Sequence, residues 1–343
     1  MVLILGAIGA AGTLPYHRLH PLLHRHPMED QASELSFDEL YDRAYAAWDR
    51  GELKDASNGF AELLRREPDN PNFHYMQGLA HKYLRDWRTS LHHNLRSQAL
   101  REEKCESSLW NAGIAATALG DWAQARHSWA ACGIKVPDGD GPVDADFGVV
   151  SIRLNPWGRG ETLFARRIDI VRARLLNVPL PESGYQFGDI VLHDGAQTGS
   201  RFDGEVKVPV FNAMARLAPS EFKTFTAFVS CDDKAGIEEL LSSSAPGVAY
   251  IEDWTDSVQY YCLRCSYNVP HRHATTDEAG SWEPDRNLGF AAQSRQLVEA
   301  LLARWVRSGE GRSLDGIEFK EVAETEPEDG QVWWQEPSFD EDK

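Results

Sequence analysis

The chain has 343 residues, enough for two or three domains with hydrophobic cores of their own. Its formal net charge of −18 argues against a general nucleic-acid binder, because such proteins hold phosphates with lysine and arginine. Five cysteines, an odd number in a long chain, do not indicate a disulfide framework, so a reducing cytoplasmic location is expected. No apolar run approaches the roughly 18 to 20 residues that span a bilayer, and we expect no membrane association.

Residues 1–35 show no clear periodicity. The first dozen or so are apolar, but no lysine or arginine precedes them, which argues against a secretory signal. We expect a disordered extension, or a mis-assigned start with Met28 rather than Met1 as the first residue. Ser36, followed three residues later by Glu39, predicts a capping box that begins the first helix.

One helix-pair pattern is repeated three times within residues 36–137. Small residues recur 34 and then 35 residues apart, and turn positions follow each of them by seven residues. The small residues are Ala44, Gly78 and Gly113, and the turn positions are Gly51, Arg85 and Gly120. Such a period is typical of a helical solenoid, in which neighbouring helix pairs complete one another's core.

The pattern resembles the tetratricopeptide repeat family over less than a third of the chain. The third copy carries the motif residues Gly113, Leu119, Gly120, Asp121, Ala125 and Trp129. The first copy carries Ala44, Ala56, Phe60 and Pro68. The second copy departs from the motif, because Ser90 and Asn94 replace the small and aromatic residues expected there.

In that family, the first helix of each pair lines a concave groove that holds a peptide. The resemblance implies a mostly aromatic partner-binding groove here, made by Tyr41, Tyr45, Trp48, Tyr75, Lys82, Tyr83 and Trp110. Family members that bind acidic chaperone tails have Lys, Arg and Asn at these places, so this set argues against that ligand. Tyrosine and tryptophan typically anchor interfaces. They also fill cores, and packing between helix pairs is the alternative role for several of these rings.

The repeats end near Pro137 without a further capping helix. Solenoid ends need a cover, and the linker that follows is short. We therefore predict that the region after the repeats packs on the third helix pair.

The rest of the chain predicts two more units, giving a multi-domain α + α/β protein. Short β-prone runs at 147–212 predict a β-rich unit, as a barrel or as an open sheet. Residues 220–322 follow the order βαββαβ of a ferredoxin-like sandwich. Its four strands are expected at 222–231, 247–254, 257–265 and 316–322.

A candidate structural zinc site comprises Cys262, Cys265, His271 and His273. Two thiolates and two imidazoles suit tetrahedral zinc. In an unbroken strand, however, the two cysteines would point to opposite faces, so a metal site requires a turn at this point. The alternative is a pair of strand cysteines followed by a polar loop.

Residues 323–343 form an acidic tail, whose composition is typical of a solvated, disordered segment. The tail also contains Trp333, Trp334 and Phe339. Aromatic residues in such a tail leave open a docking role, on a partner or in the groove of this chain.

These features favour a cytoplasmic protein-interaction protein, an adaptor or regulator that binds a protein or peptide partner through the groove. The acidic charge is compatible with a basic partner, and an immunity-type inhibitor is one form of this hypothesis. The alternatives are an enzyme in the C-terminal half whose repeats recruit substrate, and a zinc-stabilised regulator. No catalytic motif is found, so no catalytic residue is assigned and the enzyme hypothesis is the less favoured one.

Overall fold

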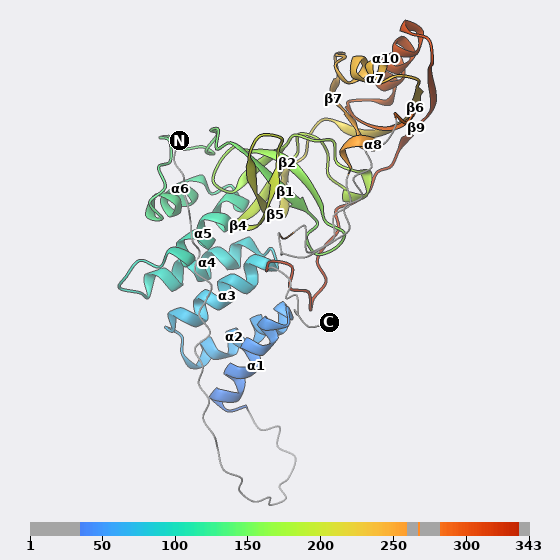
Figure 1. Cartoon of the computed structure of the whole chain (residues 1–343). Helices are drawn as coiled ribbons and strands as arrows, with labels where there is room; N and C mark the ends of the chain where they lie inside the picture. Colours follow the sequence, from blue (N-terminus) through green and yellow to red (C-terminus); the bar gives the residue numbers. More distant parts are fainter. Residues whose placement is uncertain (1–34, 259–266, 268–281, 336–343) are drawn as a thin grey trace, which may run out of the picture.

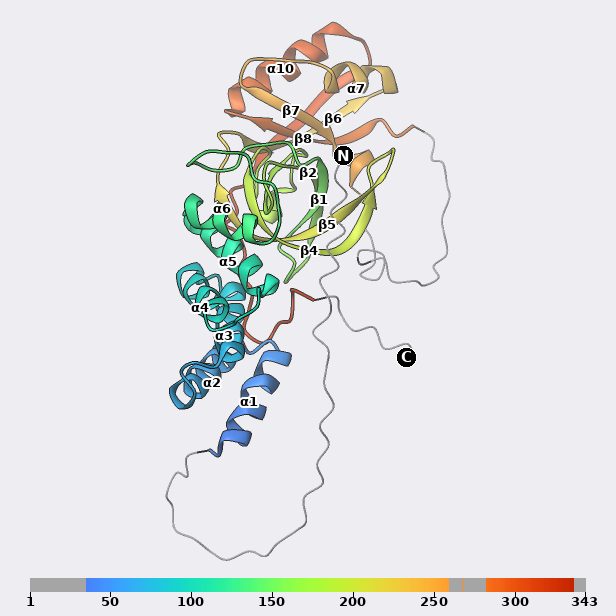
Figure 2. The ribbon, with the colours of Figure 1, turned by 90° about the vertical axis from the view of Figure 1, so that its left-hand side faces the viewer.

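The computed structural model describes residues 35–258, 267 and 282–335. The chain forms a helical region, then a closed β-barrel, then a four-stranded sheet with helices (Figure 1). The barrel lies between the other two parts, and the segment after the last strand runs back past it to the helices (Figure 2). This is the mixed α + α/β organisation that the sequence predicts. Apart from Leu35, the predicted N-terminal extension lies outside the described residues.

Six helices form three consecutive hairpins, as the repeat pattern predicts. They are α1 (Phe37–Asp49), α2 (Leu53–Arg66), α3 (Pro71–Tyr83), α4 (Trp87–Ala99), α5 (Glu106–Leu119) and α6 (Trp122–Ala131). The capping box at the start of α1 is confirmed. Ser36 Oγ accepts a hydrogen bond from Glu39 N at 3.2 Å, and the Glu39 carboxylate accepts one from Ser36 N at 2.9 Å.

Glycine brings the helices of the second and third pairs close together. A Cβ at Gly78 would lie 2.5 Å from Asn94 Nδ2, and one at Gly113 would lie 2.5 Å from the ring of Trp129. Real side chains do not approach so closely, so these two positions have no room for a larger residue. The repeat spacing of the sequence is therefore a packing requirement.

Five strands close into a barrel. They are β1 (Val149–Leu154), β2 (Glu161–Arg167), β3 (Arg172–Leu175), β4 (Ile190–Phe202) and β5 (Lys207–Ala218), with a short helix η1 (Pro181–Ser183) between β3 and β4. Strands adjacent in the chain pair antiparallel, and parallel pairing of β1 with β5 closes the barrel. Apolar side chains fill its interior, among them Ile152, Leu175 and Val191.

The second sheet has the strand order β7-β8-β6-β9, and all its pairs are antiparallel. Its elements are β6 (Lys223–Cys231), α7 (Lys234–Leu241), β7 (Val248–Asp253), α8 (Trp254–Ser257), β8 (Asp285–Ala292), α10 (Arg295–Ser308) and β9 (Arg312–Phe319). Figure 2 shows α7 and α10 together on the face away from the barrel. Their apolar side chains share one core with the sheet.

The sequence prediction missed strand β8 of this sheet. The strand between β7 and β6 is β8, in a segment predicted to be polar loop and helix start. Leu288, Phe290 and Ala292 alternate into the core, whereas the sequence pattern assigns the final alanines to the helix. Ser257 is the last residue of α8, and Val258 follows it. The rest of the strand predicted at 257–265 lies outside the described residues.

The helical region and the barrel share one hydrophobic core. Ile170, Leu192 and Met214 of the barrel region belong to the same cluster of buried side chains as Trp129 of α6. The guanidinium of Arg172 also lies over the ring of Trp122, at the start of α6. This confirms that the region after the repeats packs on the third helix pair.

After β9, residues 320–335 contain neither helix nor strand. Figure 2 shows this segment passing the barrel and returning to the ends of the repeat helices. We call residues 323–334 the strap. Within the described part of the chain, no helix is long and apolar enough to cross a membrane.

The barrel and the second sheet meet at residues 177–180. Glu252 of β7 accepts a hydrogen bond from Val178 N at 2.8 Å, and Glu161 of β2 accepts one from Leu180 N at 3.1 Å. Burial raises the pKa of both carboxyl groups, that of Glu161 to about 8. The folded protein therefore binds a proton at Glu161 at pH values where the unfolded chain has released it.

We expect Glu161→Gln to flatten the pH dependence of stability. Because the pKa is raised in the folded state, the free energy of unfolding of the wild type falls as pH rises from about 4.5 to about 8, by at most about 1.4 kcal/mol per pH unit from this group. The glutamine variant lacks this contribution. Denaturant titrations of both proteins at pH 5 and pH 8.5 measure it, and an equal loss of stability in both would contradict the assignment.

Candidate functional site

The candidate site is the groove lined by α1, α3 and α5, the first helices of the three pairs. Its central contact is between rings of the groove and rings of the strap. Trp334 stacks on Tyr83 of α3, with ring centroids 4.5 Å apart and planes 15° apart. Trp334 also lies 5.1 Å from the ring of Trp48 of α1. The chain therefore places its own C-terminal segment in the predicted groove.

The neighbouring ring, Trp333, is held from the other side. Its centroid lies 5.4 Å from Tyr83 and 5.2 Å from Trp157, which follows β1, and both contacts are edge-to-face. Asn212 Nδ2 of β5 donates a hydrogen bond to the carbonyl oxygen of Trp333 at 3.0 Å. Trp333 and Trp334 are only 3% and 6% exposed. The expectation of a solvated tail is thus wrong for this stretch, because the two rings find an apolar surface that composition alone does not show.

Polar contacts fix the chain just before the two rings. Gly330 N donates to Gly51 O at 3.0 Å, and Leu53 N donates to Asp329 Oδ1 at 2.9 Å. Leu53 begins α2 and also donates to Gly51 O at 2.9 Å, so the carboxylate of Asp329 is a second acceptor at the positive end of this helix. The backbone of Gln331 lies so close to Gly51 that a Cβ there would be 2.7 Å from its carbonyl carbon.

Arg85 connects the strap to the second helix pair. Its guanidinium pairs with Glu326 at 3.0 Å and lies 5.7 Å from the ring centre of Trp157. Its φ is +60°, in the left-handed region, where the equivalent positions Gly51 and Gly120 carry glycine. A residue with a side chain costs about 1–2 kcal/mol in this conformation, so the arginine occupies a strained position where it can contact the strap.

Further along, the strap runs over the barrel. Arg216 of β5 pairs with Glu324 at 2.7 Å, and Trp157 Nε1 donates to Thr325 Oγ1 at 2.9 Å. Gly184, with φ +77°, leaves room for the strap backbone, since a Cβ there would lie 2.9 Å from the carbonyl carbon of Ala323. The strap therefore contacts both the barrel and the helices.

Lys82 of the predicted groove faces the barrel rather than the strap. Its Nζ donates to Asp194 Oδ1 at 2.8 Å and to Asn111 Oδ1 at 3.1 Å, and Tyr83 OH donates to Asp194 Oδ2 at 2.9 Å. Lys82 and Asp194 are 3% and 5% exposed. Burial, together with this carboxylate, raises the pKa of Tyr83 well above its usual value. The network holds the barrel against α3 and α5.

Trp110 and the remaining tyrosines of the predicted groove lie in different surroundings. Trp110 of α5 donates from Nε1 to Asp194 O at 3.2 Å and so also belongs to the contact with the barrel. Tyr45 lies edge-on to Phe60, with centroids 5.1 Å apart, and contributes to the core between α1 and α2. Tyr41 stacks near Tyr45 and is 39% exposed.

Tyr75 of α3 is half-buried, and burial raises the pKa of its phenol. Tyr41 and Tyr75 lie toward the N-terminal ends of α1 and α3, about two turns from Trp48 and Tyr83, whereas Tyr45 lies within one turn of Trp48. The groove thus has a part occupied by the strap and a part in which Tyr41 faces solvent.

The four proposed zinc ligands, Cys262, Cys265, His271 and His273, lie outside the described residues. Among the residues that the structure describes, no group of three or more His, Cys, Asp or Glu side chains is arranged to hold a metal ion.

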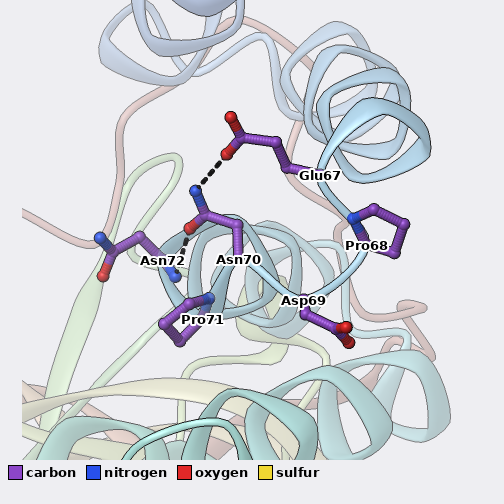
Figure 3. Close-up of a pocket in the computed structure, with 6 residues that line it drawn as sticks. All are labelled: Glu67, Pro68, Asp69, Asn70, Pro71 and Asn72. Atoms are coloured by element: carbon purple, nitrogen blue, oxygen red, sulfur yellow. Dashed lines mark hydrogen bonds between the residues drawn. The ribbon is translucent and has the colours of Figure 1, made fainter.

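A surface hollow of about 460 Å³ lies at the turn between α2 and α3 (Figure 3). It is lined by the consecutive residues 67–72. Asn70 Nδ2 donates to Glu67 Oε2 at 2.7 Å, and Asn72 N donates to Asn70 Oδ1 at 3.0 Å. Since these polar groups pair with one another, the hollow is a feature of the turn and is not a candidate site.

We expect Gly51→Ala to release the strap and Gly120→Ala to leave it in place. Both glycines have positive φ, so both changes cost about 1–2 kcal/mol from backbone strain. Only at Gly51 does the new Cβ collide with the strap; at Gly120 the nearest atom, in Trp122, is 3.8 Å away. Limited proteolysis should cleave the strap faster in the first variant alone. Equal cleavage in both variants would contradict the observed contact.

We expect Asp194→Ala to lower the free energy of unfolding by about 3–5 kcal/mol, because it leaves the Lys82 ammonium buried without its counter-ion. Adding Lys82→Met should recover part of this loss, since the buried charge is then removed. Denaturant titrations of the two single variants and the double variant measure the coupling. Additive losses would show that the two groups do not depend on each other.

No family model matches the chain, and no curated protein matches it. Among solved structures, a helical segment covering 28% of the chain is similar to the TPR2B domain of yeast Sti1 in complex with pHsp70, at 12% identity, 76% coverage of that chain and a TM-score of 0.26. The chain is also similar to the CopN–Scc3 complex, at 18% identity, 28% coverage of this chain, 56% coverage of that chain and a TM-score of 0.27.

Proposed function

We propose that this chain is a protein-interaction protein, an adaptor or regulator, whose repeat groove binds a segment of a partner polypeptide. One observation carries the proposal: the groove already holds an extended polypeptide, with Trp334 against the rings of both Tyr83 and Trp48. A surface that receives one extended segment through its side chains has the shape and chemistry to receive another.

The composition of the groove supports this function. Tyrosine and tryptophan are the residues that most often dominate binding energy at interfaces, because they bury large areas with few rotatable bonds. Beyond the strap, Tyr41 is 39% exposed, and Tyr45 and Tyr75 are half-buried. These three rings extend the aromatic surface past the strap and offer contacts to a longer segment.

We also propose that the C-terminal sheet is a ferredoxin-like sandwich and forms a unit separate from the barrel. Its order, β7-β8-β6-β9 with antiparallel pairs, and its two helices on one face support this assignment. Fold alone does not indicate a reaction. Within this proposal the partner segment binds at the repeat groove, and the C-terminal sheet adds a second surface for contact.

Affinity capture with the intact chain tests the proposed function. We expect a stoichiometric protein partner that is lost when Tyr45→Ala and Trp48→Ala are combined, because these rings belong to the groove. Tyr250→Ala is the matched control, since Tyr250 is an aromatic residue with 44% exposure and Figure 1 shows its strand, β7, far from the repeat helices α1–α6. Circular dichroism verifies that the variants are folded. A partner retained by the folded groove variant and lost by the control would overturn the proposal.

A further inference from the structure

The strap is attached to the helices by few backbone contacts. One backbone hydrogen bond, from Gly330 N to Gly51 O, joins it to them in the described part of the chain. The strap adds no strand to the barrel or the second sheet, since residues 320–335 have no strand pairing. Such a segment can leave without breaking a sheet or a helix.

The ion pair that joins the strap to the helices lies at the surface. Glu326 pairs with Arg85, but its side chain is 81% exposed. Exposed ion pairs contribute little to stability because water screens them. The less exposed pair of Glu324 with Arg216 holds the strap to the barrel, so most of the attachment to the groove depends on two rings, Trp333 and Trp334.

The docked rings leave two polar groups unpaired. Among the described residues, neither Trp333 Nε1 nor Trp334 Nε1 has a hydrogen-bond acceptor, although both atoms are buried. A buried donor without an acceptor is costly, and tryptophan in a protein interior usually finds a partner for its N–H. The groove therefore holds its own strap in an imperfect arrangement that a better-matched segment can improve on.

Arg85 is a strained residue of the α3–α4 turn that contacts the strap. It holds a left-handed backbone conformation where the two equivalent turns have glycine, and its side chain reaches toward Glu326. Strain of this kind, at a residue that contacts a removable segment, is typical of sites where binding or switching takes place.

From these observations we propose that the strap is an intramolecular competitor for the groove, and that the partner displaces it with a segment of the same chemistry. That segment is extended and acidic and carries two adjacent aromatic residues. The aromatic pair is required by the surface of Trp48, Tyr83 and Trp157. The acidic residues are matched by the guanidinium of Arg85 and by the N-terminus of α2, where Leu53 N donates to Asp329 as well as to Gly51 O.

This proposal rests on the proposed function and specifies its ligand. It replaces the expectation of a basic partner for the part of the partner that enters the groove, because Glu326 and Asp329 of the strap meet a cation and a helix N-terminus there. These contacts do not constrain the charge of the rest of the partner's surface.

The test uses the full-length chain and a fluorescent synthetic peptide of residues 323–335 of this sequence, ending Gly-Gln-Val-Trp-Trp-Gln. In the wild type the strap competes with the peptide. Trp333→Ala combined with Trp334→Ala removes the rings of the strap and leaves every groove residue unchanged. Fluorescence anisotropy should give a peptide affinity at least about tenfold higher for this variant than for the wild type, as expected when a buried aromatic anchor is removed from a competitor.

A second variant covers the case in which the double variant folds poorly. Glu326→Lys changes an exposed residue and places two cations together at Arg85, so it loosens the strap without touching the core. We expect peptide affinity to increase by roughly two- to fivefold, the size of a surface ion-pair effect. Adding Trp48→Ala to the double variant should abolish peptide binding, as should replacing both tryptophans of the peptide with alanine.

Three results would overturn the proposal in different ways. Equal peptide affinity in wild type and variants would show that the strap does not compete, while the groove still binds peptides and the proposed function stands. Absence of peptide binding to the folded variants would exclude an acidic, aromatic segment as the ligand. The proposed function would then be tested by the affinity-capture experiment alone. Exchange of straps between two copies, seen by light scattering as a wild-type dimer that the double variant does not form, would make a second copy the occupant.

Discussion

The stacking of Trp334 on Tyr83, in a cluster that Trp48 completes, is the contact on which the arrangement of the chain depends. It lies in the groove of the repeats, yet the ring that fills it comes from beyond the last strand of the second sheet. The strap therefore links the first part of the chain to the last and passes over the barrel on the way. An extended segment without strand pairing gains little docking free energy from backbone hydrogen bonds. Burial of the two indole rings therefore supplies most of the free energy that holds the strap in the groove.

The barrel limits what the groove can do. It approaches α3 and α5, where Asp194 accepts hydrogen bonds from Lys82 and Trp110, and Asn111 accepts a second one from Lys82. A buried lysine paired with a buried carboxylate specifies one arrangement of the two parts, since either charge alone would be costly to bury. The side of the groove near α5 is thus closed by the barrel. The side near α1 is held by the strap, and the tyrosines beyond it face solvent or the repeat core. The barrel therefore bounds the groove on the α5 side, and the strap, which we propose is displaced by the partner, covers it on the α1 side.

The sequence predicts the helix pairs well because their constraints are local. The spacing of small residues and the Ser36 capping box both appear in the structure. It fails at β8, where a short apolar run next to a helix has no pattern that distinguishes strand from helix start. It also fails for the strap, since acidic composition indicates solvation and the apolar surface that receives Trp333 and Trp334 forms only in the fold. Lys82 was mis-assigned for the same reason. Helical spacing places it on the groove face of α3, but the barrel residue that pairs with it, Asp194, comes more than 100 residues later in the chain.

Hydrogen–deuterium exchange at the strap tests the central claim most directly. The amide of Gly330 donates to the carbonyl oxygen of Gly51, so its protection depends on docking of the strap. In the wild type, we predict slow exchange for the peptide that contains this amide, and fast exchange once Trp333 and Trp334 are both replaced by alanine, with α4 and the barrel unchanged. Fast exchange at this amide in the wild type would contradict the account, because the strap would then not occupy the groove in solution.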